Sequence, residues 1–250
     1  MEKTYFIIPA YNEAENITEL VREWYPVVEQ ADRAGEARLV IINDGSTDAT
    51  YQILCRCAAE RPLLIPLTKP NGGHGSAVLY GYRYAIRHGA DYIFQTDSDR
   101  QTDPAEFRKF WKLRHRYDAV IGYRYDRQDG AFRVFTEKVL LAVIRIVFGV
   151  MLPDANAPYR LMRADLVRKY IHIMPHDFNL PNALLTAFFA YCREPVRFVR
   201  ISFRPRQKGN NSVNAASIIR IGRHAVIDFI RLKKKLRDSQ KNIDGSEGKC

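Results

Sequence analysis

The sequence has little cysteine, and the cysteines it has form no recognisable cluster. The 250 residues include four of them: Cys55, Cys57, Cys192 and Cys250. The first two are separated by one residue rather than the two of a redox or zinc pair, and the total is far below the density of a secreted disulfide scaffold. Cysteine usage therefore argues against a zinc finger or a disulfide-stapled domain and favours a reducing, cytosolic setting.

Long apolar runs and a leader-like N-terminus are also missing. From Met1 the chain passes directly into the strand-like Thr4–Pro9, without the basic region, apolar core and cleavage site of a signal peptide. The longest apolar stretch, Val139–Leu152, is interrupted by Arg145 and is shorter than the roughly 18 to 20 residues that span a bilayer. We therefore expect a chain that does not cross a membrane.

Positive charge is what the sequence has in excess. The net charge is +11 and the pI is near 9.5, so the surface should attract an anionic partner such as nucleic acid, phospholipid or a phosphorylated substrate. Composition does not choose among these. With 46% hydrophobic residues the chain can bury a full core, and its length requires only one domain.

Short apolar runs alternate with longer amphipathic ones in the first half, which is typical of parallel strands joined by crossover helices. The expected strands are Thr4–Pro9, Leu39–Asn43, Leu63–Leu67, Tyr92–Gln95 and Ala119–Tyr123. The expected helices are Glu13–Tyr25, Ala49–Glu60, Ser76–His88 and Pro104–Tyr117. We predict an α/β fold with a mostly parallel central sheet flanked by helices, and a ligand crevice beyond the carboxyl ends of its strands.

Two carboxylates follow the strand expected at Tyr92–Gln95. Asp97 and Asp99 are two residues apart, so an extended backbone places both on the same side, where the crevice opens. Such paired oxygen ligands suit Mg²⁺ or Mn²⁺ bridging to a diphosphate. An Asp-x-Asp is common in surface turns, and its position after a buried strand is what favours a metal site.

Two other loops enter helices at the same edge. In Asn43–Asp48, Gly45 permits a tight turn and Asp44 is free to bond a nucleotide base or ribose, although helix capping alone also explains the segment. Asn71–Ala77 is glycine-rich, which lets backbone N–H groups approach a ligand closely. It has the spacing of neither a P-loop nor a dinucleotide fingerprint.

Two helices are expected in the second half. Phe135–Leu152 is apolar nearly all round, as either a core helix or a membrane-contacting helix would be. Residues 213–237 should form a basic amphipathic helix, which either packs on the domain with a charged solvent face or meets anionic headgroups. Residues 238–250 are polar, and we expect a disordered tail there.

Four segments together resemble the family-2 inverting glycosyltransferases, which have the GT-A nucleotide-diphosphosugar fold. They stand in the family's order: Pro9–Glu13, Asn43–Asp48, Asn71–Ala77 and Asp97–Gln101. The resemblance implies a UDP- or GDP-sugar donor, with Asp97 and Asp99 on Mg²⁺ or Mn²⁺. The donor-binding residues that it implies are Pro9, Tyr11, Glu13, Asp44, Gly45, Asn71, Gly73, Asp97 and Gln101.

The closer resemblance is to the polyprenyl-phosphate branch of the family, the dolichyl-phosphate mannose synthase type. Gln101 follows the Asp-x-Asp as in that branch, Gly122-Tyr123-Arg124 is similar to its Gly-x-Arg, and Arg133 and Thr136 lie where it has Arg and Ser before an apolar helix. Asp154–Arg160 resembles its Asp-x-x-Ser-Gly-Phe-Arg.

A last segment, Arg206–Ser212, resembles the branch's Arg-x-x-Gly-x-Ser, and we take residues 1–212 as the catalytic domain. Three departures put the exact substrate, not the class, in question: Ala157-Pro158 replaces Ser-Gly, one extra residue precedes Ser212, and Asn43 replaces the more common Asp.

The resemblance implies transfer to a polyprenyl phosphate at the cytoplasmic face of a membrane, reached through the apolar and basic helices or with a separate membrane subunit. It gives catalytic roles to Asp99, Arg124 and Asp154, the last as a base or an orienting group, and acceptor contacts to Arg133, Thr136, Arg206 and Ser212.

The presence or absence of a catalytic base helps to predict the acceptor, because a sugar hydroxyl must lose a proton whereas a lipid phosphate is already an anion. Phe178–Leu185, where relatives that glycosylate hydroxyls often carry an acid, has none. This mildly favours the phosphate over the alternative, a saccharide hydroxyl. A nucleic-acid-binding module is a remoter alternative. The chain has no recognisable nucleic-acid fold, and we expect no such partner.

Overall fold

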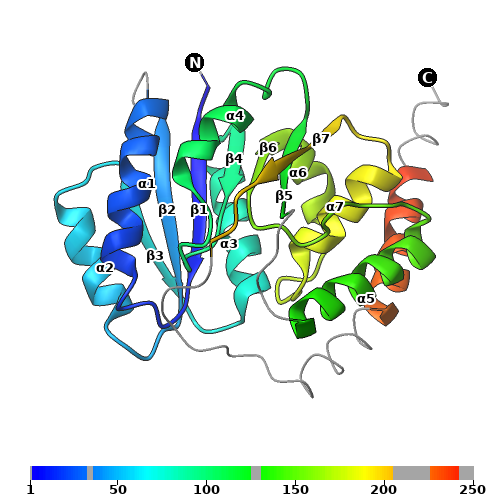
Figure 1. The fold of residues 1–250 in the computed structure, drawn as a ribbon, viewed down its shortest axis with the longest axis horizontal. Helices are drawn as coiled ribbons and strands as arrows, with labels where there is room; N and C mark the ends of the chain where they lie inside the picture. The colour runs from blue at the N-terminus through cyan, green and yellow to red at the C-terminus, as the bar shows by residue number, and fades with distance from the viewer. Residues whose placement is uncertain (1, 33–35, 125–130, 205–225, 242–250) are drawn as a thin grey trace.

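The computed structural model describes residues 2–32, 36–124, 131–204 and 226–241, with the side chains of residues 131–134 excepted. Its centre is a seven-stranded sheet of order β3-β2-β1-β4-β6-β5-β7 (Figure 1). The strands are β1 (Thr4–Ala10), β2 (Ala37–Asp44), β3 (Leu64–Lys69), β4 (Tyr92–Gln95), β5 (Ala119–Arg124), β6 (Arg160–Arg163) and β7 (Val196–Ile201). Strand β6 runs antiparallel to β4 and β5, and the other pairings are parallel, so the expected α/β fold is confirmed.

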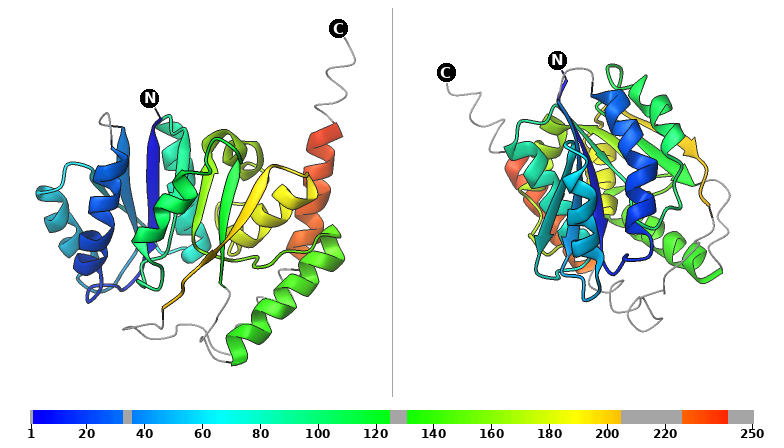
Figure 2. Two further views of the ribbon diagram at one scale, coloured as in Figure 1. Left: turned by 45° about the horizontal axis from the view of Figure 1, so that its top comes forward. Right: turned by 90° about the vertical axis from the view of Figure 1, so that its left-hand side faces the viewer.

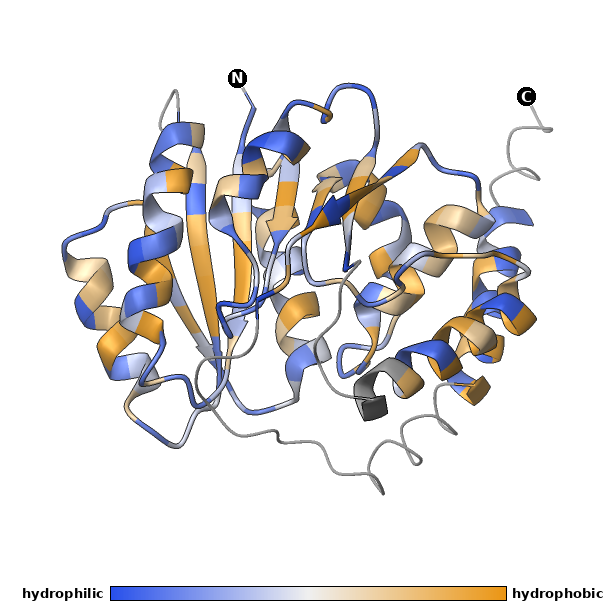
Figure 3. Cartoon of the chain, viewed as in Figure 1, coloured by the Kyte–Doolittle hydropathy of each residue, from blue (hydrophilic) through white to orange (hydrophobic). Residues whose placement is uncertain are grey.

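Helices cover both faces of the sheet (Figures 1 and 2). They are α1 (Ile17–Ala31), α2 (Thr50–Ala59), α3 (His74–Arg87), α4 (Phe107–Trp111), α5 (Ala131–Phe148), α6 (Ala164–Ile171) and α7 (Pro181–Tyr191). Alternation along β1 sends Phe6 and Ile8 into a core with α1, α2 and α4, and Tyr5 and Ile7 into a core with α3, α6 and α7. Because both faces are covered, β1 and β2 are buried along nearly their whole length. Figure 3 shows hydrophobic stretches along these central strands.

The predicted strands are confirmed within a few residues, and the helices less closely. Helix α1 begins at Ile17 rather than Glu13, because residues 13–16 form a turn in which the Glu13 carbonyl accepts from Asn16 N at 2.9 Å. The single helix predicted over Pro104–Tyr117 is wrong: a 3₁₀ turn, η1 (Pro104–Glu106), leads into the short α4. Its predicted cap is confirmed, since Asp103 Oδ1 accepts from Ala105 N at 3.0 Å.

The two C-terminal helices lie side by side (Figure 2). Helix α5 spans Ala131–Phe148 rather than Phe135–Leu152, and a further helix spans residues 226–241. Lys233 Nζ donates to Val147 O at 2.6 Å, and the Phe148 and Phe229 rings lie 6.0 Å apart. We expected this helix to end at residue 237 and a disordered tail to follow, but residues 238–241 are still helical, so that boundary is wrong. Residues 213–225 of the predicted helix and 242–250 of the predicted tail lie outside the described residues.

Each of these helices has one buried side and one exposed side. Ile144 and Phe229 are fully buried, whereas Ile146 is 82% and Ile230 is 56% exposed. Apart from Tyr11, the large exposed hydrophobic side chains in the described part of the chain lie on these helices or, for Met151, just after α5: Phe135, Val139, Ile146, Met151, Ile227 and Ile230. No helix in the ranges given above is long and apolar enough to cross a membrane.

Candidate functional site

The loops that follow β1, β2 and β3 come together at the carboxyl edge of the sheet, and we call residues 11–16, 45–49 and 70–73 the loop wall. Asn12, in the left-handed region with φ 52°, ties the first two loops together. Its Oδ1 accepts from Thr47 N at 2.9 Å and its N–H donates to Ser46 Oγ at 2.9 Å. This edge is where the strand order changes direction, between β1 and β4, which is the usual place for a ligand in such sheets.

Asp44 joins the second and third loops. It is 2% exposed, its Oδ1 pairs with Lys69 Nζ, and the same oxygen accepts from Gly72 N at 3.1 Å. Gly45 has φ 65°, and a Cβ there would meet Asn71 N at 2.5 Å, so the turn requires glycine. The loop is thus fixed before any ligand arrives, and the donor contact of Asp44 stays a prediction.

The glycine-rich segment is needed for packing. A Cβ on Gly75 would lie 2.2 Å from Phe178 O, so the start of α3 presses directly on the backbone of residues 178–179. Gly73 has φ 84° and ends the loop. Close backbone contact therefore explains Gly75 and the left-handed backbone explains Gly73, so neither glycine depends on ligand approach alone.

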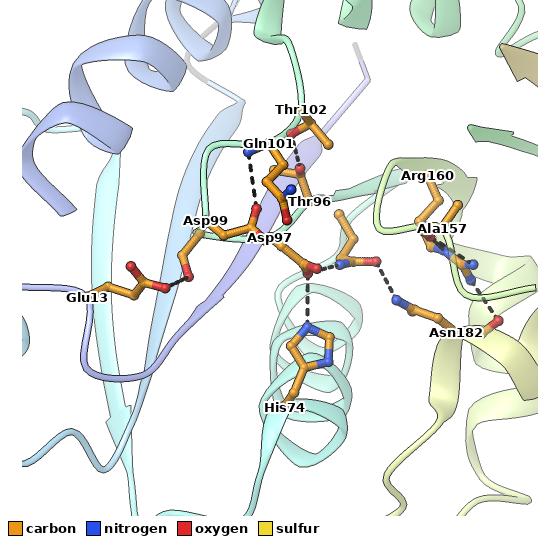
Figure 4. A network of polar contacts seen from close by, with 12 residues as sticks. Glu13, His74, Thr96, Asp97, Asp99, Gln101, Thr102, Ala157, Arg160 and Asn182 are labelled. Atoms are coloured by element: carbon orange, nitrogen blue, oxygen red, sulfur yellow. Dashed lines mark hydrogen bonds and ion pairs between the residues drawn. The ribbon is translucent and has the colours of Figure 1, made fainter. Parts of the chain in front are cut away.

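Asp97 and Asp99 lie just beyond β4, both partly exposed. Asp97 Oδ1 accepts from Gln95 Nε2 at 3.1 Å and lies 2.9 Å from His74 Nε2 (Figure 4). Asp99 Oδ1 accepts from Gln101 N at 3.1 Å. Desolvation lowers the pKa of His74, but the charge of Asp97, its hydrogen bond and the charges of Asp99 and Asp44 outweigh it and raise that pKa above its ordinary value.

The turn that carries these carboxylates is anchored on two sides. Arg100 has φ 59°, unusual for a residue with a side chain, and its NH2 group pairs with Glu23 Oε1 of α1 at 2.5 Å. Gln101, 2% exposed, donates from Nε2 to Arg204 O at 2.9 Å. Glu13, 7% exposed, accepts from Ser98 Oγ at 3.4 Å. Glu13 and Gln101, both predicted donor contacts, thus support the turn from within.

A second group, which we call the ion-pair wall, consists of Arg124, Glu137 and Asp154. Arg124 donates from Nε to Asp154 Oδ2 at 2.8 Å and from NH2 to Asp154 Oδ1 at 2.9 Å, a bidentate pair with both side chains nearly buried. Glu137 Oε2 lies 3.9 Å from Arg124 NH2, and Glu137 Oε1 accepts from Ala155 N at 3.0 Å. Burial raises the pKa of Asp154, but the hydrogen bonds and charge of Arg124 outweigh it and hold that pKa below its ordinary value.

The remaining predicted site residues are less gathered. Pro9 is buried in β1, Tyr11 is 44% exposed and Asn71 is exposed, all near the loop wall. Thr136 lies on α5. The Arg133 side chain and the segment with Arg206 and Ser212 lie outside the described residues.

The sequence interpretation missed a buried polar network behind Asp97. Gln95 Oε1 accepts from Asn182 Nδ2 at 3.1 Å and from Tyr82 OH at 3.4 Å, and the Asn182 carbonyl accepts from Arg160 NH1 at 3.2 Å. Gln95, two residues before Asp97, was a usable signal, because a polar side chain at the end of an apolar, buried strand needs a partner. Asn182 carried no such signal, and neither did His74 or Glu137.

A cavity of about 390 Å³ lies elsewhere, lined in part by Glu2, Asp91, Arg163 and Arg168. Glu2 precedes β1 and Asp91 precedes β4, so it is at the amino edge of these strands. Arg163 there is already paired with Asp165 and Asp118. The chemistry of the Asp97 region, not the size of this cavity, therefore identifies the candidate site.

A mostly parallel α/β sheet with paired carboxylates at its carboxyl edge is the arrangement expected of a GT-A glycosyltransferase domain. A family model described as "Glycosyl transferase family 2" matches residues 5–180, which is more than half of the chain. The protein belongs to glycosyl transferase family 2.

Curated relatives are named for a lipid-phosphate reaction. The chain is 27% identical over 218 residues to the undecaprenyl-phosphate 4-deoxy-4-formamido-L-arabinose transferase of Pseudomonas syringae pv. syringae (strain B728a), which covers 86% of this chain and 62% of that protein. It is 30% identical over 185 residues to the enzyme of that name from Sodalis glossinidius (strain morsitans). That match covers 72% of this chain and 55% of the Sodalis protein. The chain thus spans little more than half the length of the curated relatives it matches.

A solved structure supports the fold. Glucosyl-3-phosphoglycerate synthase from Mycobacterium tuberculosis, crystallised with Mn²⁺ and uridine-diphosphate-glucose, superimposes with a TM-score of 0.65 at 15% identity. The match covers 92% of this chain and 79% of that one. At this identity the similarity concerns the fold alone, and the predicted GT-A architecture is confirmed.

Proposed function

We propose that this protein transfers a sugar from a nucleotide diphosphosugar to a polyprenyl phosphate at a membrane surface. The observation that carries the choice of acceptor is the bidentate Arg124–Asp154 pair. A carboxylate held in this way, with a lowered pKa, is a poor proton acceptor. A phosphate acceptor needs no base, and the curated relatives are named for undecaprenyl phosphate.

The donor belongs at the loop wall, beside Asp97 and Asp99. Two carboxylates fit Mg²⁺ or Mn²⁺, which prefer oxygen ligands. Within the described ranges no three His, Cys, Asp or Glu side chains gather into a metal cage, so diphosphate and water oxygens would complete the coordination. A bound metal supplies positive charge to the leaving diphosphate, and the crystallised relative with Mn²⁺ and uridine-diphosphate-glucose supports this assignment.

The membrane contact would be made by α5 and the helix over residues 226–241. Their exposed isoleucines, Ile146, Ile227 and Ile230, provide apolar area, and Lys234, Lys235 and Arg237 add positive charge close by. Each basic residue near an anionic surface contributes about 1 kcal/mol. We therefore expect peripheral binding at the cytoplasmic face, either through these helices alone or with the help of a separate membrane subunit.

A comparison of three acceptors tests the proposal. Purified protein is incubated with radiolabelled UDP- and GDP-sugars, Mn²⁺ or Mg²⁺, and one acceptor at a time: a short polyprenyl phosphate, the matching polyprenol, or an oligosaccharide. We expect product with the phosphate only. The polyprenol is the matched control, because it keeps the chain and lacks the anion. Product with the oligosaccharide alone would establish the saccharide-hydroxyl transferase instead.

A further inference from the structure

Arg160 is a buried positive charge. It stands at the start of β6, opposite Gln95 of β4, and is 0% exposed, the only fully buried Arg or Lys among the residues the structure describes. Its N–H groups bond neutral oxygens: Ala157 O at 3.3 Å, Asn182 O at 3.2 Å and Thr186 Oγ1 at 3.0 Å. The nearby Tyr82 hydroxyl stays neutral, because burial raises its pKa.

Other cations near the site are paired with acids. Arg124 bonds Asp154, and Lys69 bonds Asp44, so in both places positive and negative charge cancel. None of the described carboxylates lies within ion-pair distance of Arg160. A guanidinium keeps its proton in proteins, and burying its charge without a counter-ion is unfavourable. An anion at the site would offset that cost.

Only neutral amides separate this charge from the site. Arg160 NH1 bonds the Asn182 carbonyl, Asn182 Nδ2 bonds Gln95 Oε1, and Gln95 Nε2 bonds Asp97 Oδ1. Figure 4 shows Arg160 and Asn182 at one end of this network and Asp97 at the other. Both amide side chains are buried, and salt screens a buried charge much less than an exposed one.

We propose that Arg160 is a positioning residue that acts through Asn182 and Gln95 on Asp97, and whose buried charge makes the site more favourable for a diphosphate. This inference rests on the proposed function, because it takes the region of Asp97 and Asp99 as the diphosphate site. It has two effects of opposite sign. The charge strengthens binding of an anion, and it weakens binding of a bare cation to the same carboxylates.

The experiment removes the charge and keeps the length of the side chain. Arg160→Met and wild-type protein are compared in two titrations: pyrophosphate without metal, by calorimetry, and Mn²⁺ without nucleotide, by electron paramagnetic resonance. We expect pyrophosphate to bind about tenfold more weakly and Mn²⁺ more tightly by a similar factor, as for unit charges separated by a few polar groups. Thr186→Val is the matched control. It removes one hydrogen bond to the guanidinium and keeps the charge, so both constants should stay within about twofold of wild type.

A second variant keeps the test decisive if Arg160→Met does not fold. Asn182→Asp places a negative charge in the network between Arg160 and Asp97, at the side chain that bonds Gln95, and should give the same pair of opposite shifts. Weaker binding of both pyrophosphate and Mn²⁺, or unchanged binding of both, would overturn the proposal. A purely structural role would not shift the affinities for an anion and a cation in opposite directions. Wild-type protein that binds neither pyrophosphate nor Mn²⁺ would overturn the proposed function itself, and this inference with it.

Discussion

The loop wall and the ion-pair wall border the same edge of the sheet but are held together differently. The loop wall is stabilised by side chains that bond neighbouring turns, as Asn12 does with Ser46 and Thr47. The ion-pair wall depends on buried charge. Arg124 is the last residue of β5, and its partner Asp154 lies in the loop before β6. A tight turn is destabilised by a residue that cannot adopt its backbone conformation, whereas a buried ion pair is destabilised by the loss of either charge. The two walls should therefore fail under different substitutions.

The largest expected effect is loss of transfer when the carboxylates beside the loop wall are altered. Asp99→Ala should lower kcat at least about 100-fold, because charge on the leaving diphosphate loses its stabilisation. The initial rate with a labelled donor measures it. Asp165→Ala, an exposed acid on α6, is the control and should keep the wild-type rate. Retained activity in the Asp99 variant would mean that the metal assignment is wrong.

The next effect concerns the ion-pair wall and is one of stability. Asp154→Asn leaves Arg124 without its bidentate partner, and we expect the free energy of unfolding at neutral pH to fall by about 3 kcal/mol. Urea denaturation measures it. Because the pKa of Asp154 is depressed from its ordinary 3.8, its contribution is complete above that value and is lost as the pH falls through the folded-state pKa. The gap between wild type and variant should therefore stay constant from neutral pH down to about 5 and close in stronger acid. A gap that does not depend on pH would contradict the ion-pair origin.

The packing of α3, which follows the loop wall, against residues 178–179 can be tested with a single methyl group. In Gly75→Ala the new Cβ would lie 2.2 Å from Phe178 O, and the resulting shift should lower the free energy of unfolding by about 2 kcal/mol. Gly89→Ala is the matched control. Gly89 has φ 75° and no atom within 4 Å of the added Cβ, so only backbone strain of about 1 kcal/mol should appear. Equal losses in the two variants would refute steric contact as the cause.

The smallest expected effect concerns the proposed membrane contact, which begins at α5, where Glu137 bonds the Asp154 loop. The double variant Ile146→Ser and Ile230→Ser should bind phosphatidylglycerol vesicles about tenfold more weakly, because two exposed apolar side chains are lost. Co-sedimentation measures this. Arg22→Ser on α1 should bind as wild type does. Unchanged binding by the double variant would exclude these helices as the contact.

The loop wall was the part of the site that the sequence predicted best. The strands that lead into it are largely buried and appear as apolar runs, and Asp44 at the end of β2 stands directly before the turn residue Gly45. The contact of His74 with Asp97 spans 23 residues, and no local pattern encodes it. The same holds for Gln95 and Asn182, 87 residues apart. Packing of α3 and α7 on the sheet creates these contacts.

Strand β6 and helix α7 were not predicted at all. Arg160–Arg163 is only four residues long and has an arginine at each end, which hides a strand whose first arginine is fully buried. Helix α7 is buried on nearly all sides, so its sequence lacks the alternation of polar and apolar faces from which a helix is predicted. The predicted α4 was too long because helix propensity and a good cap at Asp103 do not determine where a helix ends.

The reversed direction of β6 has a consequence for comparing relatives. In the parallel strands β1, β2, β4 and β5 the residues at the site lie at the end of the strand or after it. In β6 they lie at its start or before it, since Gln95 at the end of β4 pairs with Arg160 at the start of β6. Asp154 and Arg160 thus occupy positions that a search after each strand would skip. When homologous sequences are aligned, the segment that leads into this strand should be weighed as heavily as the Asp-x-Asp turn.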